Sequence, residues 1–192
     1  MNVEHIRRRL DAHTPARVQA AGAARAGVAL VLQPSTDDID LLMIRRATRE
    51  GDPWSGHMAL PGGRQHERDR DIIETAARET AEEVGVDLPA HGELLGALDE
   101  LQAVARVRPL PLVISPLVWV LRRPVALVPN HVEVAEAVWV PLSFLRSDAA
   151  RGTYERTLDG VGGSYPAFQY QDYTIWGLTH RILEGFLELM EA

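Results

Sequence analysis

The amino-acid sequence predicts an α/β layered domain built around a mixed β-sheet. Short segments rich in β-branched or long apolar residues, which are typical of strands, are interspersed with segments whose apolar residues recur at helical spacing. The two kinds of segment do not alternate regularly, as they would in a purely parallel sheet with crossover helices. The 192 residues, of which 46% are hydrophobic, are expected to form one domain spanning residues 1–192.

The composition excludes several classes of function. Lysine and arginine number 20 against 27 aspartates and glutamates, and the resulting net charge of −7 disfavours a nucleic-acid partner. There is no cysteine, so neither a disulfide nor a thiolate metal site can form. No segment approaches the roughly 20 consecutive apolar residues that span a bilayer, and the N-terminus lacks the apolar stretch of a signal peptide. We therefore expect a soluble cytoplasmic protein with no membrane partner.

The beginning of the chain is expected to contain one helix and two strands. Apolar residues at helical spacing predict a short helix over residues 3–13, and residues 1–26 comprise this helix and an irregular connector. Residues 27–33 and 39–46 are short apolar stretches separated by the turn-like sequence PSTDD, which predicts two strands.

The second half of the chain is expected to add further strands and a closing helix. In chain order, the expected segments are strands at 93–101, 111–123 and 135–142, a short helix capped by Ser143, a hairpin of 153–158 with 167–171, and a helix at 175–191. Pro116 lacks an N–H group and predicts a break, a bulge or a sheet edge. Trp119, Trp139 and Trp176 lie in apolar stretches and are expected in the core.

A segment that follows a Gly-Gly turn is expected to be helical over residues 72–84. Asp71 can cap its N-terminus, and Glu74 stands three residues further on, as in a capping box. Gly85 suits the left-handed conformation that ends many helices. Both ends of this helix are therefore marked in the sequence.

Three glutamates share one face of this helix. At about 100° per residue, the side chains of Glu79, Glu82 and Glu83 fall within an arc of roughly 100°. A neighbouring arc is expected to be buried, and its members are Ile73, Ala76, Ala77, Thr80 and Val84. The carboxylates repel one another and lie near the helix C-terminus, where the macrodipole disfavours anions. A bound Mg²⁺ would compensate for this, whereas the alternative is a solvated surface network of the glutamates with Arg78.

The residues around the three glutamates favour the metal site. Arg78 lies four residues before Glu82. Its guanidinium can hydrogen-bond that carboxylate and orient it toward the metal without itself binding the metal. Gly62 and Gly63 allow positive φ and a close approach of the backbone to a ligand or metal, and Pro61 restrains the residue before it to an extended conformation. A strand, a Gly-Gly turn, a loop and an acidic helix in this order are much less expected by chance than any one of them.

Residues 60–86 resemble the Nudix box, a motif of the form G-x5-E-x7-R-E-U-x-E-E-x-G-U in which U is apolar. The matching residues are Gly63, Arg78, Glu79, Glu82, Glu83 and Gly85. Two positions depart from the motif. Asp69 stands where the box has glutamate and is one residue further from the arginine, and Thr80 takes the first apolar position. The role of Asp69 is therefore open.

The longer loop resembles the Nudix branch that contains the coenzyme A pyrophosphatases. That branch has an upstream signature L-L-T-x-R-S…G-x-V-x-F-P-G-G, and this chain has LLMIRR at 41–46 and GHMALPGG at 56–63. Arg46 replaces the serine, Leu60 replaces the phenylalanine, and the connection is two residues longer. The sequence IWGLTHRIL at 175–183 also resembles the closing segment of that branch.

The resemblance implies a Nudix-like α/β/α sandwich and metal-dependent hydrolysis of a nucleoside diphosphate linked to another group. Mg²⁺ or Mn²⁺ is the implied cofactor, with Glu79, Glu82 and Glu83 as its ligands. The implied catalytic residues are Arg78, Glu79 and Glu82. Glu82 would act either as a metal ligand or as the general base. The implied partner is a small-molecule nucleotide, and a homodimer is an assembly that analogy allows.

Coenzyme A or an acyl-CoA is the favoured substrate, and it would give 3′,5′-ADP and (acyl-)4′-phosphopantetheine. One alternative is a pyrophosphatase for another compound, such as ADP-ribose, NADH or a dNTP. The other is a Nudix-fold ligand sensor without catalysis, for which a damaged box would be expected, whereas this box keeps its three glutamates.

Further residues are candidates for contact with the substrate. The guanidinium of Arg45 suits bidentate binding of phosphate, or it is a surface arginine at a strand end. The predicted substrate-binding set is Arg45, His57, Gly62, Gly63 and Arg64. Trp54 could stack on an adenine or anchor its loop. Glu133 or Glu136, on a later loop, could supply the base, or each is a solvated loop acid.

Overall fold

The computed structural model of this chain describes residues 1–51, 54–105, 108–158 and 161–192. Its elements, in chain order, are α1 (Val3–Ala12), β1 (Ala24–Pro34), β2 (Ile39–Arg46), β3 (Met58–Ala59), β4 (Gly62–Arg64), α2 (Ile72–Val84), α3 (Leu88–His91), β5 (Gly92–Ala97), β6 (Leu101–Ala105), β7 (Arg108–Leu121), β8 (Val134–Pro141), α4 (Leu142–Leu145), η1 (Asp148–Ala150), β9 (Arg151–Leu158), β10 (Val161–Tyr170), β11 (Tyr173–Trp176) and α5 (Gly177–Glu191). The predicted helix over residues 72–84 is confirmed with its bounds. The helices predicted at 3–13 and 175–191 are confirmed with shorter bounds, because α1 ends at Ala12 and residues 175–176 belong to β11.

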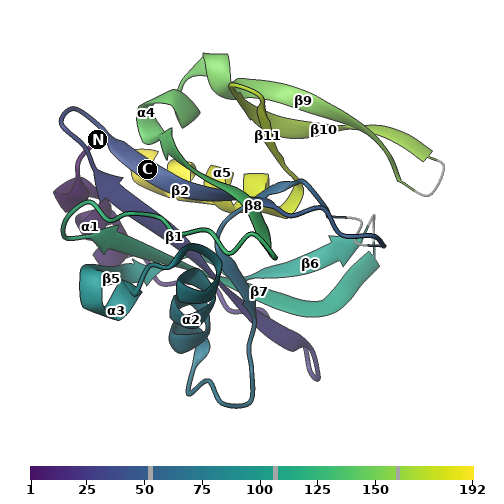
Figure 1. Cartoon of the computed structure of the whole chain (residues 1–192), viewed down its shortest axis with the longest axis horizontal. Helices are drawn as coiled ribbons and strands as arrows, with labels where there is room; N and C mark the ends of the chain where they lie inside the picture. Colours follow the sequence, from purple (N-terminus) through teal and green to yellow (C-terminus); the bar gives the residue numbers. More distant parts are fainter. Residues whose placement is uncertain (52–53, 106–107, 159–160) are drawn as a thin grey trace.

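β1 is a central strand of the main sheet (Figure 1). Within the described residues this sheet has eight strands in the order β3-β2-β1-β7-β5, with β4 also paired to β1, β6 to β7 and β8 to β2. β1 and β7 run parallel, whereas β2 and β4 run antiparallel to β1. The sheet is therefore mixed, as the sequence predicts.

One edge of β1 is shared between two partners. The end of β1 pairs with β2, where Leu32 faces Leu41, whereas its beginning pairs with β4, where Gly27 faces Gly63. Between these regions the Ala29 N–H donates to the Pro61 carbonyl at 2.8 Å. The Gly-Gly turn is therefore built into the sheet at the point where β2 leaves β1.

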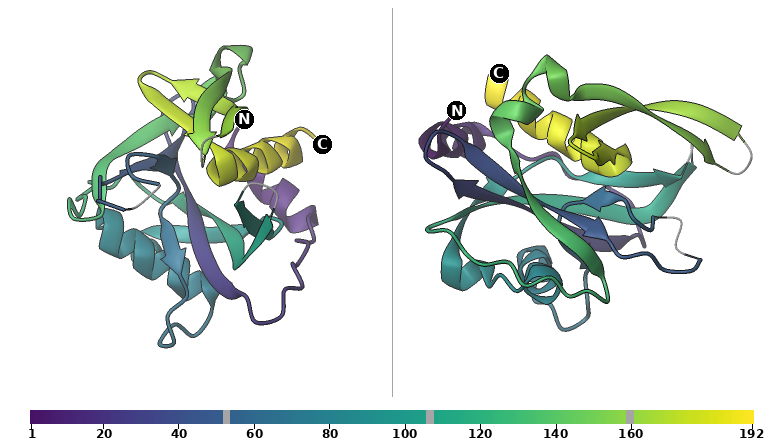
Figure 2. Two further views of the ribbon diagram at one scale, coloured as in Figure 1. Left: turned by 90° about the vertical axis from the view of Figure 1, so that its right-hand side faces the viewer. Right: turned by 45° about the horizontal axis from the view of Figure 1, so that its top comes forward.

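The two faces of the sheet are covered by different helices (Figure 2). Along β1, Ala29 and Val31 belong to the buried cluster that includes Ala76 of α2. The alternate residues, such as Leu30, belong to the cluster that includes apolar residues of α1 and α5. Successive side chains of a strand point to opposite faces, so β1 separates two layers of core. The result is the α/β/α sandwich that the resemblance implies.

A second sheet lies beside the main one. Its order is β11-β10-β9, and β9 pairs with β10 in an antiparallel hairpin that starts at the pair Arg151 and Phe168. This confirms the predicted hairpin, although part of its glycine-rich turn, residues 159–160, lies outside the described residues. In Figure 1 the hairpin extends above the main sheet and toward the right of the view.

Four local expectations are wrong. The connector ends earlier than residue 26, because β1 begins at Ala24. β7 continues through Pro116, which lies where the pairing strand changes from β5 to β6, so that proline causes no break. Pro141, not Ser143, occupies the cap position of α4, and the Ser143 hydroxyl binds Asp38 instead. Ile73 is 36% exposed, because it lines a hollow on the outer side of α2.

Among the described residues, no helix combines the length and the apolar character that a membrane crossing requires.

Candidate functional site

The acidic helix packs directly on the Gly-Gly turn. Glu83 accepts a hydrogen bond through Oε2 from the Gly62 N–H at 2.9 Å. A Cβ atom added to Gly63 would lie 2.4 Å from the carboxyl carbon of Glu79, so any larger residue here would displace that carboxylate. The structure thus brings both predicted glycines into contact with two of the three predicted glutamates.

Local sequence fixes both ends of α2. The Asp71 side chain accepts from the Glu74 N–H at 2.8 Å, and Gly85 has a φ of 73°. The capping box is not reciprocal, because the Glu74 carboxylate accepts from the N–H of Arg70 rather than of Asp71. A cap of this kind contributes about 1 kcal/mol. The predicted bounds of the helix are correct, and they place the three glutamates in its last two turns.

A distant loop closes the C-terminal end of α2. The Val128 N–H donates to the Val84 carbonyl at 2.9 Å, and the Asn130 N–H donates to the Glu83 carbonyl at 2.9 Å. These bonds satisfy carbonyl groups that a helix end leaves without partners. The same loop carries Glu133, which accepts from Arg49 at 3.3 Å.

Arg78 connects the charged groups of the site. Its Nη1 donates to Glu79 at 2.9 Å and to Glu82 at 3.1 Å. Its Nε and Nη2 each donate to Asp69 at 2.9 Å, and Nη2 also reaches the Arg64 carbonyl at 3.3 Å. The prediction that Arg78 contacts Glu82 is confirmed. The extra contact with Glu79 means that one guanidinium orients two of the carboxylates.

Asp69 is the residue whose role the sequence left open. Its side chain is 3% exposed, and besides Arg78 it accepts from the Thr75 hydroxyl at 2.9 Å and from the His66 N–H at 2.8 Å. The bonds from Arg78, with smaller contributions from His66 and Thr75, hold the pKa of this carboxyl well below its usual range. Asp69 therefore holds the guanidinium in place despite the longer loop.

Glu79 and Glu83 are the two carboxylates of α2 that burial makes harder to ionise. Glu83 is 5% exposed, and burial raises its pKa to about 8, with Glu79 and Glu133 adding to the rise and the Gly62 N–H opposing it. Burial also raises the pKa of Glu79, although Arg78 opposes that rise. Both side chains would be stabilised as anions by an additional cation.

The donor chemistry of the site fits Mg²⁺ or Mn²⁺. All three side chains offer hard oxygen ligands, and Glu79 and Glu82 already converge on the same nitrogen of Arg78. Among the described side chains, no three histidines, aspartates or glutamates are gathered as a ready-made metal cluster. The fit therefore rests on the oxygen donors and on the two raised pKa values.

The other predicted residues occupy different surroundings. Arg45 on β2 forms an ion pair with Glu136 on the adjacent strand β8 at 3.1 Å, and both side chains are exposed. Arg64 is exposed at the end of β4. The His57 ring lies 5.2 Å from that of Trp176 and accepts from Arg156 at 2.7 Å. The structure thus groups Gly62 and Gly63 with the glutamates, and groups His57 with aromatic residues.

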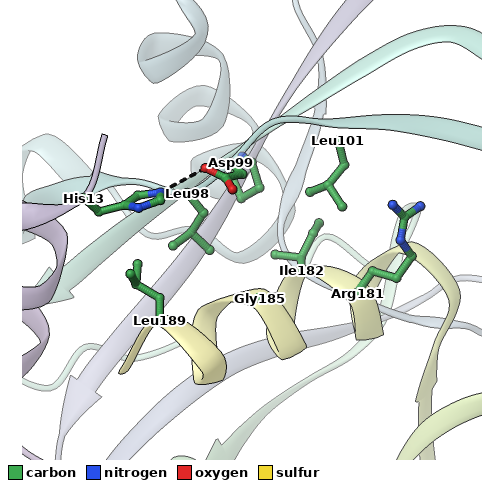
Figure 3. Close-up of a pocket in the computed structure, with 9 residues that line it drawn as sticks. His13, Leu98, Asp99, Leu101, Arg181, Ile182, Gly185 and Leu189 are labelled. Carbon is green, nitrogen blue, oxygen red and sulfur yellow. Dashed lines mark ion pairs between the residues drawn. The ribbon is translucent and has the colours of Figure 1, made fainter. Parts of the chain in front are cut away.

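Figure 3 shows a hollow of about 190 Å³ whose lining includes none of these glutamates. Leu98 and Ile182 line it and belong to the core cluster on the α5 side of the sheet, opposite α2. His13 and Asp99 form an ion pair of 3.0 Å at one end, and Arg181 lies at the other (Figure 3). This hollow contains none of the predicted site residues.

A family comparison covers the whole of this site. The NUDIX domain family matches residues 23–159, which include β1, the Gly-Gly turn, α2 and the loop that carries Glu133. The chain belongs to the NUDIX domain family. It is therefore a Nudix hydrolase, as the sequence predicts.

Named relatives agree with this assignment. The chain is 33% identical to the human mitochondrial coenzyme A diphosphatase NUDT8 over 188 residues, which are 95% of this chain and 76% of that protein. It is 43% identical over 114 residues to the uncharacterized protein C14C4.10c of Schizosaccharomyces pombe, covering 58% of this chain but only 35% of that protein. A MutT/nudix family protein from Enterococcus faecalis shares the fold, with a TM-score of 0.54 at 18% identity over 100% of this chain and 70% of that one.

Proposed function

We propose that this Nudix hydrolase cleaves the pyrophosphate bond of a nucleoside diphosphate derivative with Mg²⁺ or Mn²⁺. The observation that carries the proposal is the buried carboxylate of Glu83, which sits against the Gly62 N–H beside Glu79 and has a raised pKa. An isolated carboxylate at such a place is costly, and a dication that binds there would offset that cost.

The chain's own residues then have distinct tasks. Glu79 and Glu83 hold the cation, and Glu82 holds it or accepts a proton from the attacking water. Arg78, held by Asp69, keeps Glu79 and Glu82 in place. When bound, a metal would neutralise phosphate charge and lower the pKa of water. In the hydrolysis, a water oxygen forms a bond to phosphorus, the bridging P–O bond breaks with the bridging oxygen leaving on the second phosphate, and a carboxylate such as Glu82 accepts the proton of the water.

We further propose coenzyme A or an acyl-CoA as the substrate, which gives 3′,5′-ADP and (acyl-)4′-phosphopantetheine. The human relative is named as a coenzyme A diphosphatase, and its similarity extends over 95% of this chain. The upstream sequence from Leu41 to Arg46, which partly keeps the signature of that branch, points the same way. Arg45, His57, Gly62, Gly63 and Arg64 stay the predicted contacts of the substrate.

The compartment and the assembly stay predictions. The absence of cysteine suits the cytoplasm, whereas the human relative is named as mitochondrial. A homodimer is expected only by analogy.

A metal-supplemented hydrolysis screen tests the function. We expect the purified chain with Mg²⁺ or Mn²⁺ to release 3′,5′-ADP from coenzyme A, and EDTA to stop the release. The comparison substrates are ADP-ribose, NADH and dNTPs. Rapid cleavage of one of these without release of 3′,5′-ADP would contradict the coenzyme A assignment. Tight nucleotide binding with no metal-stimulated turnover would instead indicate a ligand sensor.

A further inference from the structure

Six side chains from two distant parts of the chain form a cluster in which only His57 belongs to the predicted substrate contacts. This aromatic cluster consists of Trp54, His57, Tyr154, Arg156, Tyr165 and Trp176. Trp54 and His57 precede β3, Tyr154 and Arg156 lie on β9, Tyr165 lies on β10, and Trp176 ends β11. In Figure 1 the segment that follows β2 and the hairpin of β9 and β10 both extend to the right of the view.

Trp176 lies at the centre of the aromatic cluster. Its ring centroid is 4.8 Å from that of Tyr154, 5.2 Å from that of His57 and 6.3 Å from that of Trp54. Trp176 is 7% exposed, as expected for a core residue. The exposed member is Trp54, which keeps 43% of its surface open to solvent. A large indole held in place at the surface offers a flat face to a planar ligand.

Arg156 gives the aromatic cluster a positive charge. Its guanidinium lies over the rings of both tryptophans, 5.7 Å from the centroid of Trp54 and 5.1 Å from that of Trp176. Its Nη1 also donates to His57 Nε2 at 2.7 Å. These contacts fix the indole of Trp54 from the inner side and favour a ligand that carries negative charge. An aromatic base attached to a phosphate has both properties.

The segment that carries Arg49 and Ser55 connects the aromatic cluster to the acidic helix. Arg49 donates to the Val132 carbonyl at 2.9 Å and to Glu133 at 3.3 Å. The Asn130 N–H, from the same loop as Glu133, donates to the Glu83 carbonyl at 2.9 Å. Arg49 also exchanges two hydrogen bonds of 2.9 Å with the Ser55 hydroxyl, next to Trp54. The segment therefore joins Trp54, beside the hairpin, to the chain that binds the C-terminal end of α2. In a nucleoside diphosphate only a ribose separates the phosphates from the base, so a site for the base must lie near the acids.

We propose that the aromatic cluster binds the nucleobase of the substrate, which stacks on Trp54 while Arg156 and Trp176 support that indole. The proposal rests on the proposed function for the identity of the ligand as a nucleotide. It adds the site that recognises the base, at residues outside the Nudix box. Stacking of a base on an aromatic side chain contributes about 1–3 kcal/mol, so one tryptophan can change nucleotide affinity about tenfold or more.

Binding of two small probes without metal tests the proposal. AMP carries a base and ribose 5-phosphate does not, and calorimetry in EDTA measures both without turnover. We expect the intact chain to bind AMP about tenfold more tightly than ribose 5-phosphate. Trp54→Ala should weaken AMP about tenfold and leave ribose 5-phosphate unchanged, whereas Trp54→Phe should retain most of the affinity. Trp54 is exposed, so neither change is expected to unfold the chain.

Tyr170 supplies a matched aromatic control at the other end of the second sheet. It packs against Phe144 and Tyr173, outside the aromatic cluster, so Tyr170→Leu should leave both affinities unchanged. The proposal is overturned if the intact chain does not prefer AMP, or if Trp54→Ala leaves the preference unaltered. Failure to hydrolyse coenzyme A would contradict only the proposed function. The AMP binding assay would still test the base site, because it requires no metal and no turnover.

Discussion

Glu83 is the carboxylate whose surroundings most favour a bound cation. It is almost fully buried, and its one hydrogen bond from a backbone N–H, that of Gly62, only partly offsets the effect of burial on its pKa. Glu83→Gln keeps the shape and can still accept from Gly62, but it removes the charge. We expect kcat to fall by roughly 10²–10⁴-fold while the circular dichroism spectrum stays unchanged.

Glu74→Gln is the matched control for that change. Glu74 lies on the same helix, but its carboxylate binds Arg70 and is not a proposed metal ligand. This variant should retain nearly normal kcat. Near-normal activity of the Glu83→Gln variant would contradict the metal site as described, because Glu83 is one of its proposed ligands.

Asp69 permits a second test at the scale of one residue. Its carboxylate holds two nitrogens of Arg78, which in turn orients Glu79 and Glu82. Asp69→Ala should lower kcat by roughly 10–100-fold, the usual effect of losing a group that orients metal ligands. The apparent affinity for Mn²⁺, measured by titration of activity, should fall with it.

A purely structural role for Asp69 predicts a different result. The variant would then lose thermal stability but keep its metal affinity in the folded protein. Arg70→Ala, which removes the partner of Glu74 on the outer side of the helix, is the control and should change neither property. Unchanged manganese titration in Asp69→Ala would contradict the positioning role.

Single residues also show how far the sequence could predict the site. Gly63 and the three glutamates are found from spacing, because helix geometry and glycine chemistry are local properties. The function of Asp69 is not found, because its contact with Arg78 depends on how the loop folds back onto the helix. The pairing of Arg45 with Glu136 joins residues far apart in sequence, and no local pattern specifies it.

At the scale of elements, the two glycines of β4 meet different neighbours. A Cβ on Gly62 would lie 2.4 Å from the Gly27 carbonyl oxygen, and its φ of +152° is rarely adopted by other residues. Gly62→Ala should therefore destabilise the fold by on the order of 1–3 kcal/mol. The three atoms nearest to a Cβ on Gly63 all belong to the carboxylate of Glu79, which can move.

Gly63→Ala should consequently cost activity more than stability. We expect its melting temperature to stay near that of the parent chain, whereas the Gly62→Ala variant melts several degrees lower. The kcat of the Gly63→Ala variant should fall at least tenfold, because the displaced Glu79 is a proposed metal ligand. Thermal melting and kcat measured on both variants decide the point, and equal effects of the two substitutions would contradict it.

Helix α5 contains a buried histidine that makes the stability depend on pH. His180 is 9% exposed and packs against Phe168, and burial lowers its pKa. Arg151 lowers this pKa further, whereas Glu184 opposes the shift. As the pH falls, His180 therefore takes up a proton at a higher pH in the unfolded chain than in the folded chain. Stability is full above the unfolded pKa of about 6.5 and is lost as the pH falls below it.

A comparison with His180→Gln isolates this contribution. From pH 7 to pH 5, the unfolding free energy of the parent chain should fall more steeply than that of the variant, by at most about 1.4 kcal/mol per pH unit. Above pH 7.5 the two slopes should coincide, because the histidine is neutral in both states. Urea unfolding at each pH gives the measurement, and parallel curves at acid pH would show that His180 is not the source.

Among the elements, those with local signals are predicted and those fixed by pairing are not. Asp71 and Gly85 mark the bounds of α2, and apolar spacing marks α1 and α5. β3 and β4 have two and three residues, too few for any alternating pattern to be seen. The parallel pairing of β1 with β7 joins residues more than 80 positions apart, and only the completed sheet specifies it.

At the scale of the whole molecule, the proposed metal site joins three separate parts of the fold. Gly62 and Gly63 belong to the sheet, the glutamates belong to α2, and the loop of Val128 and Asn130 binds the end of that helix. A ligand that binds only the folded chain stabilises it by about 2.7 kcal/mol at 100 times its Kd. Metal binding should therefore stabilise the domain as a unit.

Thermal melting in Mn²⁺ and in EDTA tests this coupling. At 100 times the Kd of the metal we expect the melting temperature to rise by roughly 5–10 °C for a chain of this size. At one fixed metal concentration the rise should be larger at pH 8 than at pH 6. The pKa of Glu83 is raised to about 8 in the folded chain. Without metal, the protonated Glu83 therefore contributes its full stability below the pKa that this group has in the unfolded chain. That contribution is lost as the pH rises toward 8. At pH 6 a proton must also leave before the metal binds.

Glu83→Gln separates the metal effect from general stabilisation by salt. Without metal this variant should melt above the parent chain at pH 8, because it buries no charge, and the two should converge near pH 5. Mn²⁺ should raise its melting temperature little, and Glu74→Gln should respond like the parent chain. If Mn²⁺ stabilised the Glu83→Gln variant as much as the parent at pH 8, the cation would bind elsewhere, and the glutamates of α2 would lose their proposed role.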